Sequence, residues 1–120
     1  MSNDFNFGET LRARRTAKAE DDPAFSLRQV ASRVGLEPSY LSKIERGEQP
    51  PPGEETICRL AEELGENPDV LLALAGKVSS DLLEIIRERP TVVAELLRAT
   101  RKMSAKRVSA ISQQIRDGEW

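Results

Sequence analysis

The sequence predicts an all-α protein, and three features support that prediction. Aromatic residues make up 4% of the chain and charged residues 32%, which is typical of helical proteins rather than of β-sandwiches or barrels. Apolar residues recur every three or four positions, as in amphipathic helices. Residues that begin or end helices, such as Ser26, Gly35 and Gly65, separate these segments. A chain of 120 residues suits one domain, or one small domain with a helical appendage.

Charge and cysteine content limit the possible partners. The formal net charge is −2, so any contact with nucleic acid must come from a local basic patch. Cys58 is the single cysteine, which excludes an internal disulfide and fits a reducing cytosol; we expect a buried structural thiol. No signal peptide is visible, and the longest apolar run, Val70 to Ala75, is too short to span a membrane. We therefore predict a cytoplasmic protein with no membrane partner.

Enzyme chemistry finds little support. The chain contains no histidine, so it cannot assemble an imidazole base, a catalytic triad or a histidine-bearing metal site. It has no second cysteine for a CxxC motif and no glycine-rich phosphate loop. Its carboxylates have the spacing of solvated helix faces. We expect no catalytic residues, no cofactor and no metal.

The most informative stretch is residues 26–47, SLRQVASRVGLEPSYLSKIERG. Ser26 is a good N-cap, and Gln29 three residues later completes a capping box. A short amphipathic helix follows and ends at Gly35. Pro38 then suits the first position of a second helix, which ends at Gly47. Two helices this short, joined by so tight a corner, are typical of a helix-turn-helix.

Gln29 to Gly47 resembles the Xre/Cro/cI-like (lambda-repressor-like) helix-turn-helix family. The matching residues are Ala31 in the first helix, Gly35 and Leu36 in the turn, Tyr40-Leu41-Ser42 in the second helix and Ile44-Glu45-Arg46-Gly47 at its end. The resemblance runs from about Leu11 to Leu74. It implies a five-helix DNA-binding domain over residues 1–76 of a sequence-specific transcriptional regulator. A helical hairpin unrelated to DNA is the alternative.

The resemblance also implies which residues contact DNA, because the second helix of this family enters the major groove. The candidate base-reading residues are Pro38, Ser39, Tyr40, Ser42 and Lys43. Lys43 is the firmest of these, since its ammonium can donate to guanine O6 and N7. The alternative for Lys43 is contact with phosphate alone. The candidate phosphate contacts are Arg28, Arg46 and Gln49, which would set register without reading sequence.

A further implied role is structural. Arg15 occupies the family position that pairs with the glutamate of the second helix, here Glu45. A planar guanidinium suits a buried bidentate pair, and the bond would join the first helix to the recognition helix. Contact of Arg15 with phosphate is the alternative.

At the N-terminus we expect a frayed segment from Met1 to Phe7 and a first helix from Gly8 to Ala19.

The N-terminal half departs from the family in several places. The connection from Glu20 to Ala24 is longer and more acidic than usual; it is either a solvated loop or a negative element that limits non-specific binding or meets a partner. Leu27 replaces a common glutamine, which leaves Arg28 as the substitute for phosphate. Glu37 is a weak cap for the second helix.

Two more helices complete the predicted domain. The first runs from Glu54 to Leu64, and the second follows Asn67 and stops at Gly76. Residues 77–120 lie outside the family signature and predict three helices: Asp81 to Arg89, Pro90 to about Lys102, and one capped by Ser104.

The three C-terminal helices carry more apolar surface than they can hide among themselves. We expect some of it to pack on the first domain and the rest on a second copy. The candidate dimer or partner residues are Leu82, Leu83, Ile86, Val93, Leu97, Val108, Ile111 and Ile115. The prediction is a homodimeric repressor on a palindromic double-stranded operator. The alternative is the antitoxin of a toxin–antitoxin pair, whose C-terminal helices bind a toxin.

A second basic cluster surrounds the last predicted turn. Its members are Arg98, Arg101, Lys102, Lys106 and Arg107. A solvated face, a second DNA contact and a site for an acidic partner are all open interpretations.

Overall fold

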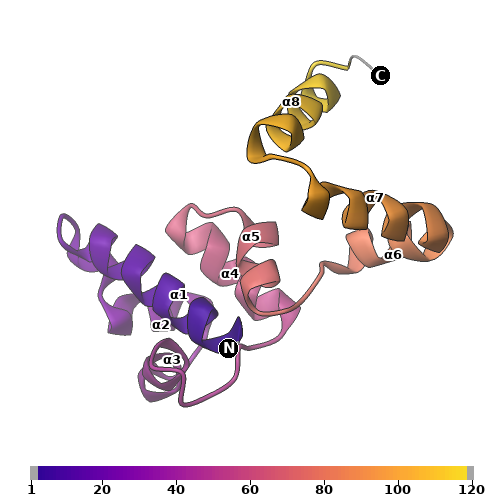
Figure 1. Cartoon of the computed structure of the whole chain (residues 1–120). Helices are drawn as coiled ribbons and strands as arrows, with labels where there is room; N and C mark the ends of the chain where they lie inside the picture. The colour runs from indigo at the N-terminus through magenta and orange to yellow at the C-terminus, as the bar shows by residue number, and fades with distance from the viewer. Residues whose placement is uncertain (1–2, 119–120) are drawn as a thin grey trace. The chain divides into compact units, whose positions relative to one another are not determined.

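In a computed structural model, which describes the backbone of residues 3–118 and the side chains of residues 7–118, the regular elements are all helical (Figure 1). The all-α prediction is confirmed. The chain divides into two compact units, with the boundary between Ser79 and Ser80. The first unit contains α1 (Asn3–Ala19), a 3-10 helix η1 (Pro23–Phe25), α2 (Leu27–Val34), α3 (Pro38–Glu45), α4 (Glu54–Leu64) and α5 (Pro68–Leu74). The second contains α6 (Ser80–Glu88), α7 (Pro90–Lys102) and α8 (Ala105–Arg116).

The first unit is built around one apolar core. Helix α2 packs on α3 and α4, α4 packs on α5, and α1 lies across α3, α4 and α5. The buried core side chains are Phe7, Leu11, Val30, Ala31, Val34, Leu41, Ile44, Ile57, Leu60, Ala61, Leu64, Leu71 and Leu72. Cys58 is half-buried against this core rather than fully buried as predicted, because it lies beside the inward stripe of α4.

The start of α1 corrects the sequence prediction. The helix begins at Asn3, not Gly8, and Phe7 is fully buried in the core rather than part of a frayed terminus. Gly8 lies inside the helix at its crossing with α3: a Cβ there would lie 2.4 Å from the Ile44 carbonyl oxygen. The glycine therefore serves close packing, not helix initiation. Met1, Ser2 and the side chain of Phe5 lie outside the described part of the chain.

The acidic connection is partly ordered by its own side chains. Asp22 Oδ1 accepts a hydrogen bond of 2.9 Å from the Ala24 N–H, which starts η1. Ser26 Oγ accepts from the Gln29 N–H at 3.2 Å and caps α2, as predicted. The predicted capping box is only half formed, because the Ser26 N–H donates to the Pro23 carbonyl instead. The segment from Glu20 to Pro23 is exposed, as expected of a solvated connection.

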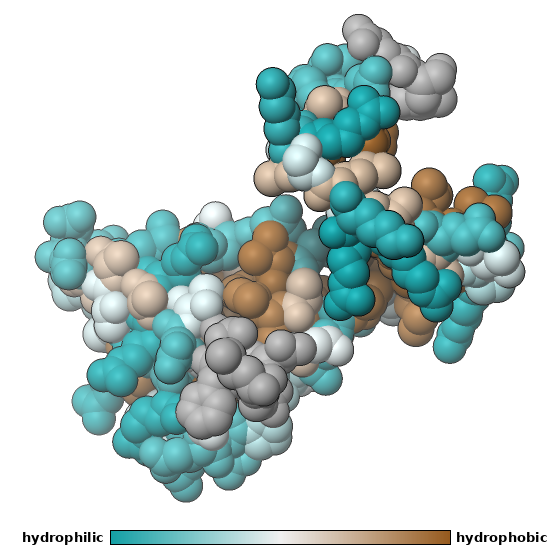
Figure 2. Space-filling view, in the orientation of Figure 1, coloured by the Kyte–Doolittle hydropathy of each residue, from teal (hydrophilic) through white to brown (hydrophobic). Residues whose placement is uncertain are grey.

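The described residues of the second unit, 80–118, form no buried core. Helices α6 and α7 form a hairpin, but no residue of α6, α7 or α8 is buried. Helix α7 has the predicted bounds, and Ser104 Oγ accepts from the Arg107 N–H at 3.1 Å to cap α8. Apolar residues lie open on the surface of the hairpin (Figure 2). The large exposed apolar side chains of this unit are Leu82, Leu83, Ile85, Val92, Leu96, Leu97 and Ile115.

Candidate nucleic-acid interface

The corner between α2 and α3 is tight. Gly35 adopts the left-handed conformation (φ 82°), and its N–H donates to the Ala31 carbonyl at 2.9 Å. The Leu36 N–H donates to the same carbonyl at 2.8 Å. Ala31 is fully buried, and its small side chain lets the two helices approach closely. Glu37 is the N-cap of α3 but makes no side-chain cap bond, as its residue type predicts.

Helix α3 has one buried and one exposed face. Leu41, Ile44 and Glu45 are buried, whereas Ser39, Lys43 and Arg46 are exposed at spacings of four and three. Those spacings place Ser39 and Lys43 on one face of the helix, and Arg46, the C-cap residue, continues that face just past its end.

The remaining predicted base-reading residues of α3 are Pro38, Tyr40 and Ser42. All three are half-buried, and Tyr40 also packs against the core. Ser39 and Lys43 are therefore the members of the predicted set that are most open to a ligand.

Most cations of the first unit already have a partner. Arg33 and Glu63 form an ion pair of 2.5 Å, Arg59 and Glu55 one of 2.7 Å, and Arg14 pairs with Glu66. The Lys18 Nζ lies 5.4 Å from the centroid of the Phe25 ring and the Arg33 Cζ 5.5 Å from it. These contacts tie the cations of α1, α2 and α4 to the fold.

Arg28 and Lys43 lack such partners. Both are exposed, and neither makes an ion pair within the described residues. Arg28 is the second residue of α2, next to Leu27, whose apolar side chain packs against the core. One uncommitted positive charge thus lies on each helix of the corner.

Arg46 and Gln49 lie beyond the end of α3. The Arg46 Nε lies 2.8 Å from Oε2 of Glu48, and both side chains are about half exposed. An exposed pair of this kind is worth about 0–1 kcal/mol, so a phosphate can displace Glu48 at little cost. Gln49 is exposed.

Arg12 is a further exposed cation that lies close to the end of α3. It lines an open hollow of about 400 Å³ between α1 and the end of α3, together with Glu9, Ala13, Thr16, Glu45, Arg46 and Gly47. Arg12 is exposed and makes no ion pair within the described side chains. In the sequence it is one of four cations of the first helix, with Arg14, Arg15 and Lys18, and no local pattern distinguishes it from them.

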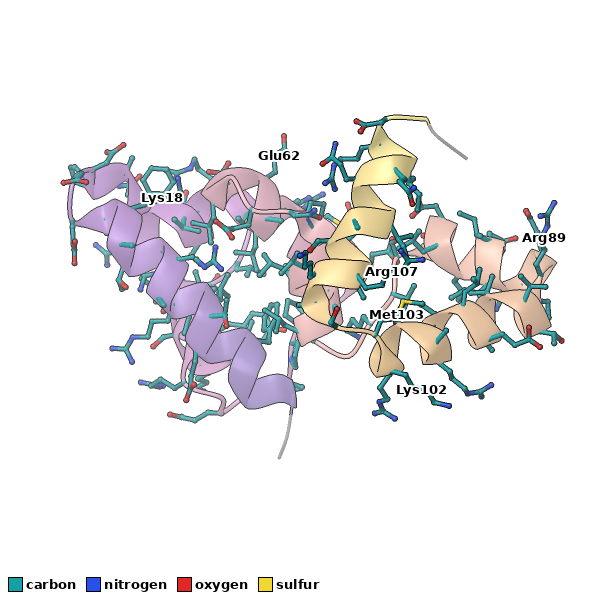
Figure 3. All side chains as sticks on the ribbon, turned by 45° about the horizontal axis from the view of Figure 1, so that its top comes forward. Lys18, Glu62, Arg89, Lys102, Met103 and Arg107 are labelled. Atoms are coloured by element: carbon teal, nitrogen blue, oxygen red, sulfur yellow. The ribbon has the colours of Figure 1, made fainter. Side chains whose placement is uncertain are left out.

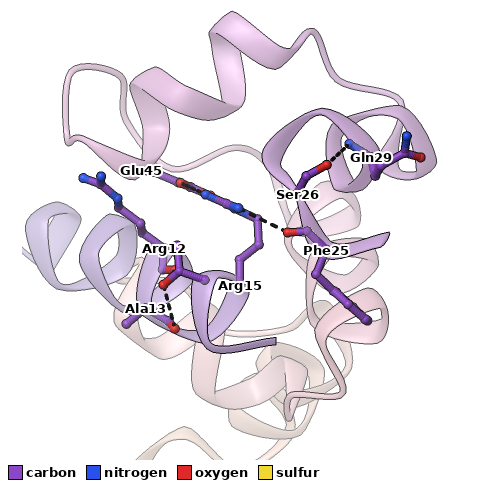
Figure 4. Close-up of polar contacts among 8 residues, drawn as sticks. Arg12, Ala13, Arg15, Phe25, Ser26, Gln29 and Glu45 are labelled. Carbon is purple, nitrogen blue, oxygen red and sulfur yellow. Dashed lines mark hydrogen bonds and ion pairs between the residues drawn. The ribbon is translucent and has the colours of Figure 1, made fainter. Parts of the chain in front are cut away.

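The structure brings Arg15 and Glu45 into a bidentate ion pair (Figure 4). Arg15 Nε donates to Glu45 Oε2 at 2.7 Å, and Nη2 donates to Oε1 at 2.9 Å. Nη1 donates to the Phe25 carbonyl at 3.2 Å, just before α2. The side chains are 9% and 3% exposed. One guanidinium therefore joins α1 to the end of α3 and to the entry of α2.

No helix among the described residues is long and apolar enough to cross a membrane. Nor do the described residues bring together three or more His, Cys, Asp or Glu side chains that could hold a metal ion.

Residues 6–75 match the model of a helix-turn-helix domain family, and this match covers more than half of the chain. No curated protein and no solved structure matches the chain. The matched residues include the α2–α3 corner, the Arg15–Glu45 pair and the exposed cations at positions 12, 28 and 43. The chain belongs to the helix-turn-helix domain family, a family of DNA-binding domains.

Proposed function

We propose that this protein is a sequence-specific transcriptional regulator of the Xre/Cro/cI-like type. It binds a palindromic double-stranded operator as a homodimer and acts as a repressor by occluding its site. The observation that supports this most is the exposed face of α3, where Lys43 has no ion-pair partner among the described residues. The buried face of the same helix is joined to α1 through Arg15 and Glu45. A rigidly held helix with a free cation on its outer face suits base recognition in a major groove.

Lys43→Ala is expected to weaken binding to the preferred operator by about 1–3 kcal/mol and to relax base preference at one position of each half-site. The reason is that a base-reading ammonium discriminates between bases, whereas a phosphate contact does not. Titration of the variant against operators that differ at single positions measures the effect. Lys77→Ala is the matched control, because Lys77 is also exposed and makes no ion pair among the described residues. Unchanged preference in Lys43→Ala would show that the reading face is misplaced.

Arg28→Ala is expected to weaken binding to all sequences to a similar extent. A lost phosphate contact also makes the slope of log K against log salt concentration less negative, by about 0.9 per copy. Arg59→Ala, which removes an exposed arginine already paired with Glu55, should leave the slope unchanged. A change of consensus in Arg28→Ala with an unchanged slope would contradict the assignment.

The second unit supports the homodimer. It has exposed apolar side chains on α6, α7 and α8, and no residue of these three helices is buried, so a partner surface would supply a core. Of the predicted dimer residues, Leu82, Leu83, Leu97 and Ile115 are exposed. Ile86, Val93, Val108 and Ile111 are half-buried.

The same lack of a core also favours the antitoxin alternative. Co-purification with a second protein in fixed ratio would support the antitoxin. A stable homodimer by itself supports the regulator.

A further inference from the structure

We propose that the second unit carries its own DNA contact, which binds the phosphate backbone without reading bases. The site is the junction of α7 and α8, here called the basic corner: Arg98, Arg101, Lys102, Lys106 and Arg107. This inference rests on the proposed function, because it assumes that the first unit brings the protein to DNA.

The charge distribution is the first argument. The basic corner has five cations within ten residues, and no Asp or Glu occurs between Glu95 and Asp117. All five side chains are exposed, and none makes an ion pair among the described residues. The first unit differs, since half of its cations are paired with carboxylates. The protein thus concentrates uncompensated positive charge in one place although its net charge is −2.

Helix stability does not account for this arrangement. Arg101 and Lys102 lie in the last turn of α7, where cations interact favourably with the helix dipole. Lys106 and Arg107 lie in the first turn of α8, where cations are unfavourable and where no acidic residue offsets them. Figure 3 shows Lys102 and Arg107 on the two sides of Met103, at the end of one helix and the start of the next. These cations have no carboxylate partner among the described residues, so a polyanion at this junction would offset their charge.

DNA is the polyanion that the chemistry favours. A duplex carries one negative charge per about 1.7 Å of helix axis, so a row of separated cations can each meet a phosphate. The lysine and arginine side chains of the two helices can each contact a different phosphate, so the contact does not require one fixed arrangement of the five side chains. The first unit belongs to a DNA-binding family, so the second unit operates at a high local concentration of DNA once the first is bound.

The test uses the full chain with Lys102→Gln and Arg107→Gln together. Its matched control is Arg87→Gln with Arg89→Gln, which removes the same charge from the same unit. Arg89 precedes α7 and Lys102 ends it, so the two sites are separated by about 20 Å of a 13-residue helix. A charge-conserving variant, Lys102→Arg with Arg107→Lys, tests whether charge alone is needed. All are titrated with random-sequence duplex DNA and with the duplex that the wild-type protein selects from a random library.

The basic-corner variant is expected to make the slope of log K against log salt less negative by about 2 per copy on both duplexes, since each phosphate contact contributes about −0.9. Its selected consensus should be that of the wild-type protein. The control and the charge-conserving variant should keep the wild-type slope. An unchanged slope in the basic-corner variant, or an equal change of slope in the control, overturns the second DNA contact. An unchanged slope is also the result expected if the basic corner binds an acidic protein instead of DNA. If the wild-type protein selects no consensus at all, the proposed function fails instead, and the salt slope still reports on the corner separately.

Discussion

Glu45→Ala is expected to lower the free energy of unfolding by about 3–5 kcal/mol, because it leaves the Arg15 guanidinium buried without its counter-charge. The Arg15 side chain is 9% exposed and loses two of its three hydrogen bonds in this variant. Small domains are stable by only about 5–15 kcal/mol, so the loss should be plain in a urea titration followed by circular dichroism without DNA. The variant should also bind operator more weakly, since the bond joins α3 to α1.

Two further variants separate burial from charge. Glu55→Ala breaks the exposed Arg59–Glu55 pair, whose side chains are 56% and 81% exposed, and should cost at most about 0.5 kcal/mol. Arg15→Lys keeps the charge but cannot form the bidentate bond together with the bond to the Phe25 carbonyl, so its loss should lie between the two. A loss below about 0.5 kcal/mol for Glu45→Ala would mean that the pair contributes no more than an exposed one.

The second large effect concerns assembly. We expect the full chain to be a dimer at micromolar concentration, and Val92→Glu to dissociate it. Val92 is 53% exposed and Leu96, one turn further along α7, is 62% exposed, so both lie on an open apolar stripe. Dissociation should lower operator affinity by roughly 10²–10⁴-fold, because linked recognition helices make the second binding event intramolecular. Sedimentation equilibrium and operator titration measure the two effects.

Val70→Glu is the matched control for the dimer. Val70 is 49% exposed on α5 in the first unit, so the same substitution adds the same charge at an apolar surface of similar exposure. It should leave the dimer intact. Leu96→Glu provides a second test of the α7 stripe. A full-length monomer at micromolar concentration, or equal dissociation by both valine variants, would remove the basis for the homodimer.

Helix bounds were predictable where local residues decide them. Helix α4 runs from Glu54 to Leu64 and α7 from Pro90 to Lys102, as predicted, because Gly53 and Gly65 flank α4 and a proline begins α7. The start of α1 was not predictable, because glycine is unfavourable inside a helix and Gly8 would be taken as its beginning. A glycine is needed there because the backbone lies close to the Ile44 carbonyl, which is distant in sequence. Close packing between segments far apart in sequence leaves no local signal.

For the candidate site, the ion pair could be predicted from the sequence, but the surroundings of other side chains could not. The resemblance placed Arg15 opposite Glu45, and the bidentate bond has that geometry. The surroundings of single side chains could not be predicted from the motif. Tyr40 packs against the core, Arg46 pairs with Glu48, and Arg12 lines the hollow beside α3. Each of these depends on which helices meet, and that is set by the tertiary fold rather than by the motif.

Selection of duplexes from a random DNA library by the wild-type full chain tests the central claim most directly. The claim is that α3 reads bases in the major groove and that two copies do so together. We expect an enriched palindrome whose half-sites lie about 34 Å apart, one turn of DNA, with a preferred base that loses its preference in Lys43→Ala. A library that emerges without any enriched sequence would contradict sequence-specific recognition by this helix-turn-helix.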